Sequence, residues 1–95
     1  MITRHVVKTC CGNKSFIFET QKPLKRTHLE EFQKAGYLAP QQFVKSGLFY
    51  VQKNGLIATS SFGTTKLQVR CNSKNCDELL NSFEKLLDSV TNATG

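Results

Sequence analysis

The sequence contains no tryptophan, and among its 95 residues it has one methionine, two prolines and two histidines. It also lacks an apolar run long enough to cross a membrane, a glycine-rich phosphate loop, a paired acidic motif and a nucleophile elbow. Catalysis by a cysteine needs a neighbouring base, and neither His5 nor His28 belongs to a recognisable motif. We therefore interpret both histidines as surface residues and expect a protein that is not an enzyme.

The first residues, Met1-Ile2-Thr3-Arg4, do not resemble a signal peptide. We therefore expect an intracellular protein that does not act at a membrane. In a reducing compartment cysteines stay as thiols, so a cluster of cysteines favours a metal site over disulfides.

The length predicts a single domain over residues 1–95, near the small end of what supports a hydrophobic core, with residues 91–95 frayed. Thirteen lysines and arginines against seven aspartates and glutamates give a formal net charge of +6. Such a balance favours anionic partners: nucleic acid, an acidic protein surface or a membrane surface.

The first half of the chain predicts a β-hairpin followed by a short helix. A β-branched run over 5–11 and an alternating run over 14–20 flank the turn signal Gly12-Asn13. Thr27 and Glu30 form a capping-box pattern, which predicts the start of a helix that ends at Gly36. A second short turn is expected after Pro40, with Phe43 and Val44 facing inward.

The region 47–71 has the clearest β pattern. Asn54-Gly55 predicts a type I′ hairpin turn, because both residues accept a positive φ. A two-residue turn at this position pairs Val51 with Ala58 and Phe49 with Ser60. The face expected to be buried in this region carries Phe49, Val51, Leu56, Ala58, Phe62, Leu67, Val69 and Cys71.

The last helix is predicted to begin at Cys76, after Asn75 as the cap, because apolar residues recur at helical spacing as far as Val90. With two helices and about five strands in the order ββαβββα, the economical fold class is α+β. We expect a two-layer sandwich in which both helices cover one face of an antiparallel sheet.

The four cysteines lie in two pairs, Cys10 with Cys11 and Cys71 with Cys76, and each pair falls at the edge of a predicted element. Structural zinc sites take soft ligands in pairs from turns, so a zinc site made of these four sulfur atoms is one hypothesis. Adjacent strand residues point to opposite faces, however, so the turn at Gly12 would have to bend the backbone. Buried thiols and disulfides are the alternatives, and the sequence leaves all three open.

If both helices cover one face, the other face of the sheet stays open. Apolar contact residues among amides and cations suit docking of another protein, whereas an aromatic ring among cations suits stacking of single-stranded nucleic acid. Protein docking is our first hypothesis, and binding of single-stranded nucleic acid through Tyr50 and the basic side chains is the alternative. The candidate binding residues are Leu48, Tyr50, Gln52, Ile57, Lys66, Gln68 and Arg70.

Several short stretches spread over most of the chain carry a resemblance. They are Lys8-Thr9-Cys10-Cys11-Gly12, Ser46-Gly47-Leu48-Phe49-Tyr50-Val51, Phe62-Gly63, Val69-Arg70-Cys71 with Cys76, and Phe83-Glu84. In these stretches the chain resembles short uncharacterised proteins encoded by tailed bacteriophages. The resemblance implies a viral origin, a location in the host cytoplasm or the virion, and a role between host takeover and virion assembly; it implies no catalytic residues.

Overall fold

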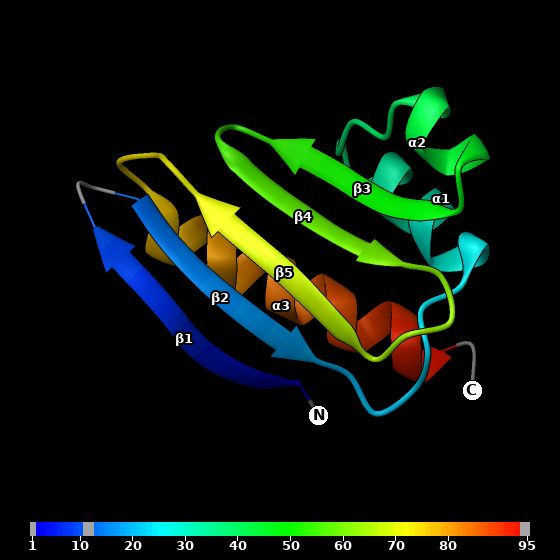
Figure 1. The fold of residues 1–95 in the computed structure, drawn as a ribbon, viewed down its shortest axis with the longest axis horizontal. Helices are drawn as coiled ribbons and strands as arrows, with labels where there is room; N and C mark the ends of the chain where they lie inside the picture. Colours follow the sequence, from blue (N-terminus) through cyan, green and yellow to red (C-terminus); the bar gives the residue numbers. More distant parts are fainter. Residues whose placement is uncertain (1, 11–12, 94–95) are drawn as a thin grey trace.

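The computed structural model describes residues 2–10 and 13–93, and within them the side chains of 2–7 and 15–91. The described chain forms five strands and three helices, of which α2 is a single short turn (Figure 1). The elements are, in order, β1 (Thr3–Cys10), β2 (Asn13–Glu19), α1 (Arg26–Lys34), α2 (Gln41–Lys45), β3 (Leu48–Lys53), β4 (Leu56–Ser61), β5 (Lys66–Cys71) and α3 (Cys76–Ala93).

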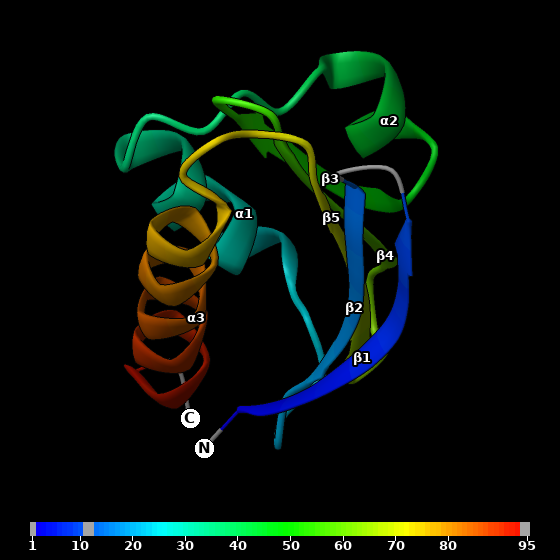
Figure 2. The ribbon, with the colours of Figure 1, turned by 90° about the vertical axis from the view of Figure 1, so that its left-hand side faces the viewer.

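All five strands belong to one antiparallel sheet with the spatial order β1-β2-β5-β4-β3. The two longer helices, α1 and α3, lie together against one face of this sheet (Figure 2). The α+β class and the two helices on one face are therefore confirmed. The short helix α2 lies apart from them, beyond β3.

The β3–β4 hairpin has the turn and the register that the sequence predicts. Asn54 and Gly55 have φ values of 50° and 92°, the left-handed conformations that a type I′ turn needs. Cα partners across the hairpin include Val51 with Ala58 and Phe49 with Ser60. Because side chains alternate along a strand, this register decides which residues face the helices.

The first hairpin also forms, with β2 in the second position of the sheet. Its register shifts between Val6 and Lys8, so Val7 is an extra residue on β1. Of the expected turn at Gly12-Asn13, Gly12 lies outside the described residues, and Asn13 is the first residue of β2, paired with Cys10.

The core lies between the sheet and the two long helices, and its centre is aromatic. The ring of Phe32 on α1 lies 5.6 Å from Phe49 on β3 and 5.1 Å from Phe83 on α3, measured between centroids. Phe83 in turn contacts Phe18 on β2 at 5.7 Å. All four rings are fully buried, so these contacts join both helices and both halves of the sheet.

The start of α1 differs from the prediction. The helix begins at Arg26 with Lys25 as its N-cap, so the pair Thr27 and Glu30 does not form the cap. Instead the backbone N–H of Lys25 donates a hydrogen bond of 3.0 Å to Nδ1 of His28. His28 is 1% exposed, which corrects its interpretation as a surface residue. His28, at the third position of the helix, thus accepts the capping hydrogen bond that the side chain of a glutamate or glutamine usually accepts.

The other two helices also depart from the prediction in detail. Val44 on α2 packs against the core, but Phe43 contacts the opposite side of the sheet at Tyr50. Helix α3 continues to Ala93 and buries Thr91, whose hydroxyl donates to the backbone oxygen of Leu87 at 2.7 Å. Residues 91–93, where fraying was expected, thus belong to the helix, while 94–95 lie outside the described residues. No helix in the described chain is long and apolar enough to span a membrane.

Candidate functional site

The open face is the side of the sheet turned away from α1 and α3. The strand register arranges its residues in rows that cross the sheet. All seven predicted binding residues lie on this face. One row holds Gln52, Ile57, Arg70 and Ser15; the next holds Tyr50, Thr59, Gln68, Ile17 and His5; the third holds Leu48 and Ser61 and, beyond a gap, Lys66, Glu19 and Thr3.

Helix α2 covers one end of the open face. The ring of Phe43 stacks on the ring of Tyr50, with centroids 4.4 Å apart and planes inclined by 20°. The expectation of a wholly bare face is therefore wrong at β3. One side of the Tyr50 ring is occupied, which leaves it less suited to stacking on a nucleic-acid base.

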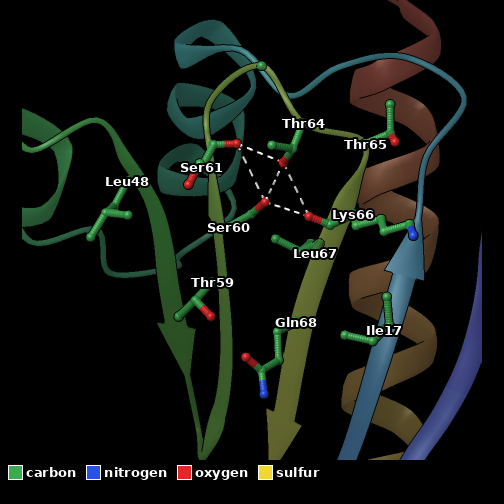
Figure 3. A pocket seen from close by; sticks show the side chains of 11 residues that line it. Ile17, Leu48, Thr59, Ser60, Ser61, Thr64, Thr65, Lys66, Leu67 and Gln68 are labelled. Carbon is green, nitrogen blue, oxygen red and sulfur yellow. Dashed lines mark hydrogen bonds between the residues drawn. The ribbon is translucent and has the colours of Figure 1, made fainter.

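A shallow hollow of about 830 Å³ lies on the open face, where β4 and β5 separate. Their pairing ends at Thr59 and Gln68, although both strands continue towards the turn that joins them. Figure 3 shows the hollow between these strand ends, with Leu48 on one side and Ile17 on the other. The hollow therefore arises because the ladder stops before the hairpin does.

Beside the hollow, where β4 and β5 are no longer paired, side-chain hydroxyl groups form hydrogen bonds between the two strand ends (Figure 3). Oγ of Ser60 donates to the backbone oxygen of Lys66 at 2.5 Å, and Oγ1 of Thr64 donates to the backbone oxygen of Ser61 at 2.9 Å. The two hydroxyl oxygens also lie 2.7 Å apart. Each hydroxyl has one proton, and acceptors within the protein, namely the two carbonyl oxygens and the other hydroxyl, are placed to take both. These hydroxyls consequently offer a ligand acceptor atoms only.

Charge is unevenly distributed between the two layers of the described chain. Six of the seven acidic residues of the sequence lie in α1 and α3, and Glu19 is the single acidic residue of the five strands. The open face carries the exposed cations Lys66 and Arg70 on β5 and one acidic residue, the half-buried Glu19 opposite Lys66. A partner that approaches the open face therefore meets mainly positive charge, whereas one that approaches α3 meets mainly negative charge.

Sequence reasoning missed the contribution of β2 to the open face. Ile17 alternates with the buried Phe16 and Phe18, so its place follows from the period-two pattern of a strand. Ile17 lies opposite Gln68 because β2 pairs with β5. This pairing joins segments about fifty residues apart in the sequence, so no local signal predicts it.

Of the four predicted cysteine ligands, the structure describes the side chains of two, and these are bonded to each other. Cys71 and Cys76 form a disulfide with Cα atoms 5.8 Å apart, and both are buried. Metal ions bind the thiolate form of cysteine, so these two sulfur atoms cannot act as metal ligands while they form a disulfide. Cys11 and the side chain of Cys10 lie outside the described residues. Among the described side chains, no three of His, Cys, Asp and Glu come close enough to hold a metal ion.

The fold and the open face define a small α+β protein with one helix-covered and one largely bare side of its sheet. No protein-family model matches the chain, and neither a curated protein nor a solved structure shows significant similarity to it.

Proposed function

We propose that this protein is a small basic binding module, not an enzyme, that docks on an acidic surface of another protein through the open face of its sheet. The observation that carries the proposal is the combination of exposed cations with an apolar hollow on one uncovered side of the sheet. The resemblance to short proteins of tailed bacteriophages leads us to propose a phage origin, with a partner in the host cell or the virion.

The hollow supports a protein partner rather than a small polar ligand. The hydroxyl protons of Ser60 and Thr64 are already used within the protein, and Ile17 and Leu48 give the hollow apolar walls. Such a site suits an apolar side chain of a partner, which would gain from leaving water without needing donors. Lys66 lines the hollow and Arg70 lies four residues further along β5, and both would attract carboxylates that flank that side chain.

Two other functions are less well supported. Binding of single-stranded nucleic acid would depend on Tyr50, which already stacks on Phe43. A structural zinc module would need the sulfur atoms of Cys71 and Cys76, which are paired with each other.

A photo-crosslinking amino acid at position 68 would test the proposal, because Gln68 lies beside the hollow at the centre of the open face. The same group at Lys85, exposed on α3, is the matched control. In a nuclease-treated bacterial lysate, we expect position 68 to give a discrete protein adduct that position 85 does not. Fold integrity of both variants is checked from their circular dichroism and unfolding midpoints.

The proposal would be overturned by equal adducts at both positions, or by none at position 68. A separate gel-shift assay with a single-stranded oligonucleotide distinguishes the main alternative. Tight binding that weakens steeply with salt and is lost in Arg70→Glu would favour nucleic acid as the ligand.

A further inference from the structure

The outer side of β1 is an unpaired edge of the sheet. β1 pairs with β2 alone, and no backbone hydrogen bond from its described residues reaches any other segment. Figure 1 shows β1 as the outermost strand, with nothing beyond it. Residues along this edge therefore direct backbone N–H and C=O groups to solvent, as every edge strand does.

The opposite edge of the sheet is protected. At β3, Gln52 forms a bridge with Leu38 in which each N–H donates to the other's oxygen, at 2.9 and 3.0 Å. Helix α2 packs on the same strand. Of the two edges, β1 is thus the one that can accept another strand in the described structure.

Exposed apolar side chains accompany the free backbone of β1. Val6 is 67% and Val7 is 57% exposed, although both belong to β1. Sheets usually protect an edge with charge, shortness or a bulge, and β1 has eight residues and a bulge at Val7. The bulge leaves Thr3–Val6 in unbroken register with β2, which gives a regular stretch for one added segment.

We propose that Thr3–Val6 of β1 accepts an extended acidic segment of a partner protein as a sixth strand. β1 contains Arg4, His5 and Lys8 and no acidic residue, in a chain of net charge +6, and of these Arg4 also pairs with Glu84 on α3. Charge complementarity therefore favours a strand with carboxylates on either side of an apolar residue that packs on Val6. This contact lies outside the open face and does not depend on the function proposed for it.

A second copy of the chain is a less suitable occupant. In an antiparallel pair of Thr3–Val6 segments, Arg4 of each copy would lie opposite His5 of the other, and extending the pair would cross the bulges. Arg4 moreover turns towards α3, where its Nε lies 3.4 Å from Glu84 and its Nη2 donates to Asn81 at 3.3 Å. A second copy supplies no carboxylate from β1 itself.

The probe is a short synthetic peptide of alternating valine and glutamate, added to isotope-labelled protein and followed by NMR. We expect the amides of Thr3–Val6 to shift and to exchange more slowly with solvent, while the amides of β3 and β4 stay unchanged. A control peptide carries N-methyl groups on the amides whose N–H would face β1. It keeps its charge but cannot donate hydrogen bonds to β1, so it should bind at least about tenfold more weakly.

Two matched variants locate the contact, because Val6 and Leu38 are similarly exposed on opposite edges. Val6→Asp should weaken binding about tenfold or more through lost packing and repulsion, whereas Leu38→Asp should leave it unchanged. Equal binding of the N-methylated peptide, or shifts confined to the open face, would overturn the proposal. Sedimentation of the peptide-free protein would also overturn it by showing a dimer that Val6→Asp dissociates. A second copy of the chain would then be the partner that binds at β1.

Discussion

Gly55 is subject to two separate constraints in the β3–β4 turn. Its φ of 92° disfavours any residue with a side chain, and a Cβ at this position would lie 2.7 Å from the backbone oxygen of Asn72. The second contact exists because the turn packs on the chain that leaves β5, where the N–H of Asn72 donates to the oxygen of Gly55.

Gly55→Ala should therefore lower the free energy of unfolding by about 2–4 kcal/mol, through backbone strain and displacement of the Asn72 backbone. Gly63→Ala is the matched control, because Gly63 has the same φ but a Cβ there would meet nothing within 4 Å. It should cost only about 1 kcal/mol. Urea unfolding of both variants measures the difference, and equal losses would show that the contact with Asn72 is unimportant.

His28 makes stability depend on pH. Burial, and to a lesser degree the charge of Lys25, lowers the pKa of His28 below its ordinary value of 6.5. The hydrogen bond that Nδ1 accepts from Lys25 also requires the neutral ring. The unfolded chain consequently binds a proton on His28 at a higher pH than the folded chain does.

The free energy of unfolding should therefore decrease as the pH is lowered from about 7.5 to about 5.5, because protonation favours the unfolded state. His28→Gln keeps an acceptor oxygen for Lys25 and should make the profile flatter. His5→Gln, which changes the exposed histidine, should retain the slope. Urea unfolding at several pH values measures this, and identical slopes in all three proteins would contradict the role of His28.

The start of α1 and the burial of His28 could not be predicted from the sequence. The pattern at Thr27 and Glu30 satisfies the usual capping rule, and nothing local marks His28 as buried. Its burial follows from α1 packing against the sheet and α3, which is a tertiary effect.

At the scale of elements, hairpins and amphipathic helices were predictable because their signals are local. The turn at Asn54-Gly55 fixes the β3–β4 register, and the apolar spacing fixes the buried stripe of α3. The side on which α2 lies had no such signal, because Phe43 and Val44 are adjacent and face different neighbours.

The junction between β5 and α3 depends on the pair Cys71 and Cys76. The disulfide closes a short loop, so the chain-entropy estimate for its removal is about 2 kcal/mol. Cys71→Ala with Cys76→Ala should lower the free energy of unfolding by about this amount and leave the fold intact, since both positions are buried within the core.

Urea unfolding with and without reductant provides the measurement. Reductant should lower the stability of the natural protein and leave that of the double variant unchanged. Rapid alkylation of both residues in the folded, unreduced protein would contradict the disulfide.

At the scale of the whole molecule, the two layers differ in charge, and this was only partly predictable. The acidic residues at the start of α3 follow from the preference of helix N-termini for negative charge. The net charge of +6 predicted an anionic partner, but the placement of Lys66 with Ile17 and Leu48 around one hollow depends on the strand order. Non-local pairing decides that order, so composition alone could not place the site.

The most direct test of the open face as the docking surface compares two charge reversals against the partner captured at position 68. Arg70→Glu changes the open face and Lys85→Glu changes the helix layer, and both side chains are exposed. We predict that Arg70→Glu weakens the affinity about tenfold or more, with a smaller loss at high salt, while Lys85→Glu changes it less than about twofold. Equal effects of the two variants, or a loss confined to Lys85→Glu, would contradict docking through the open face.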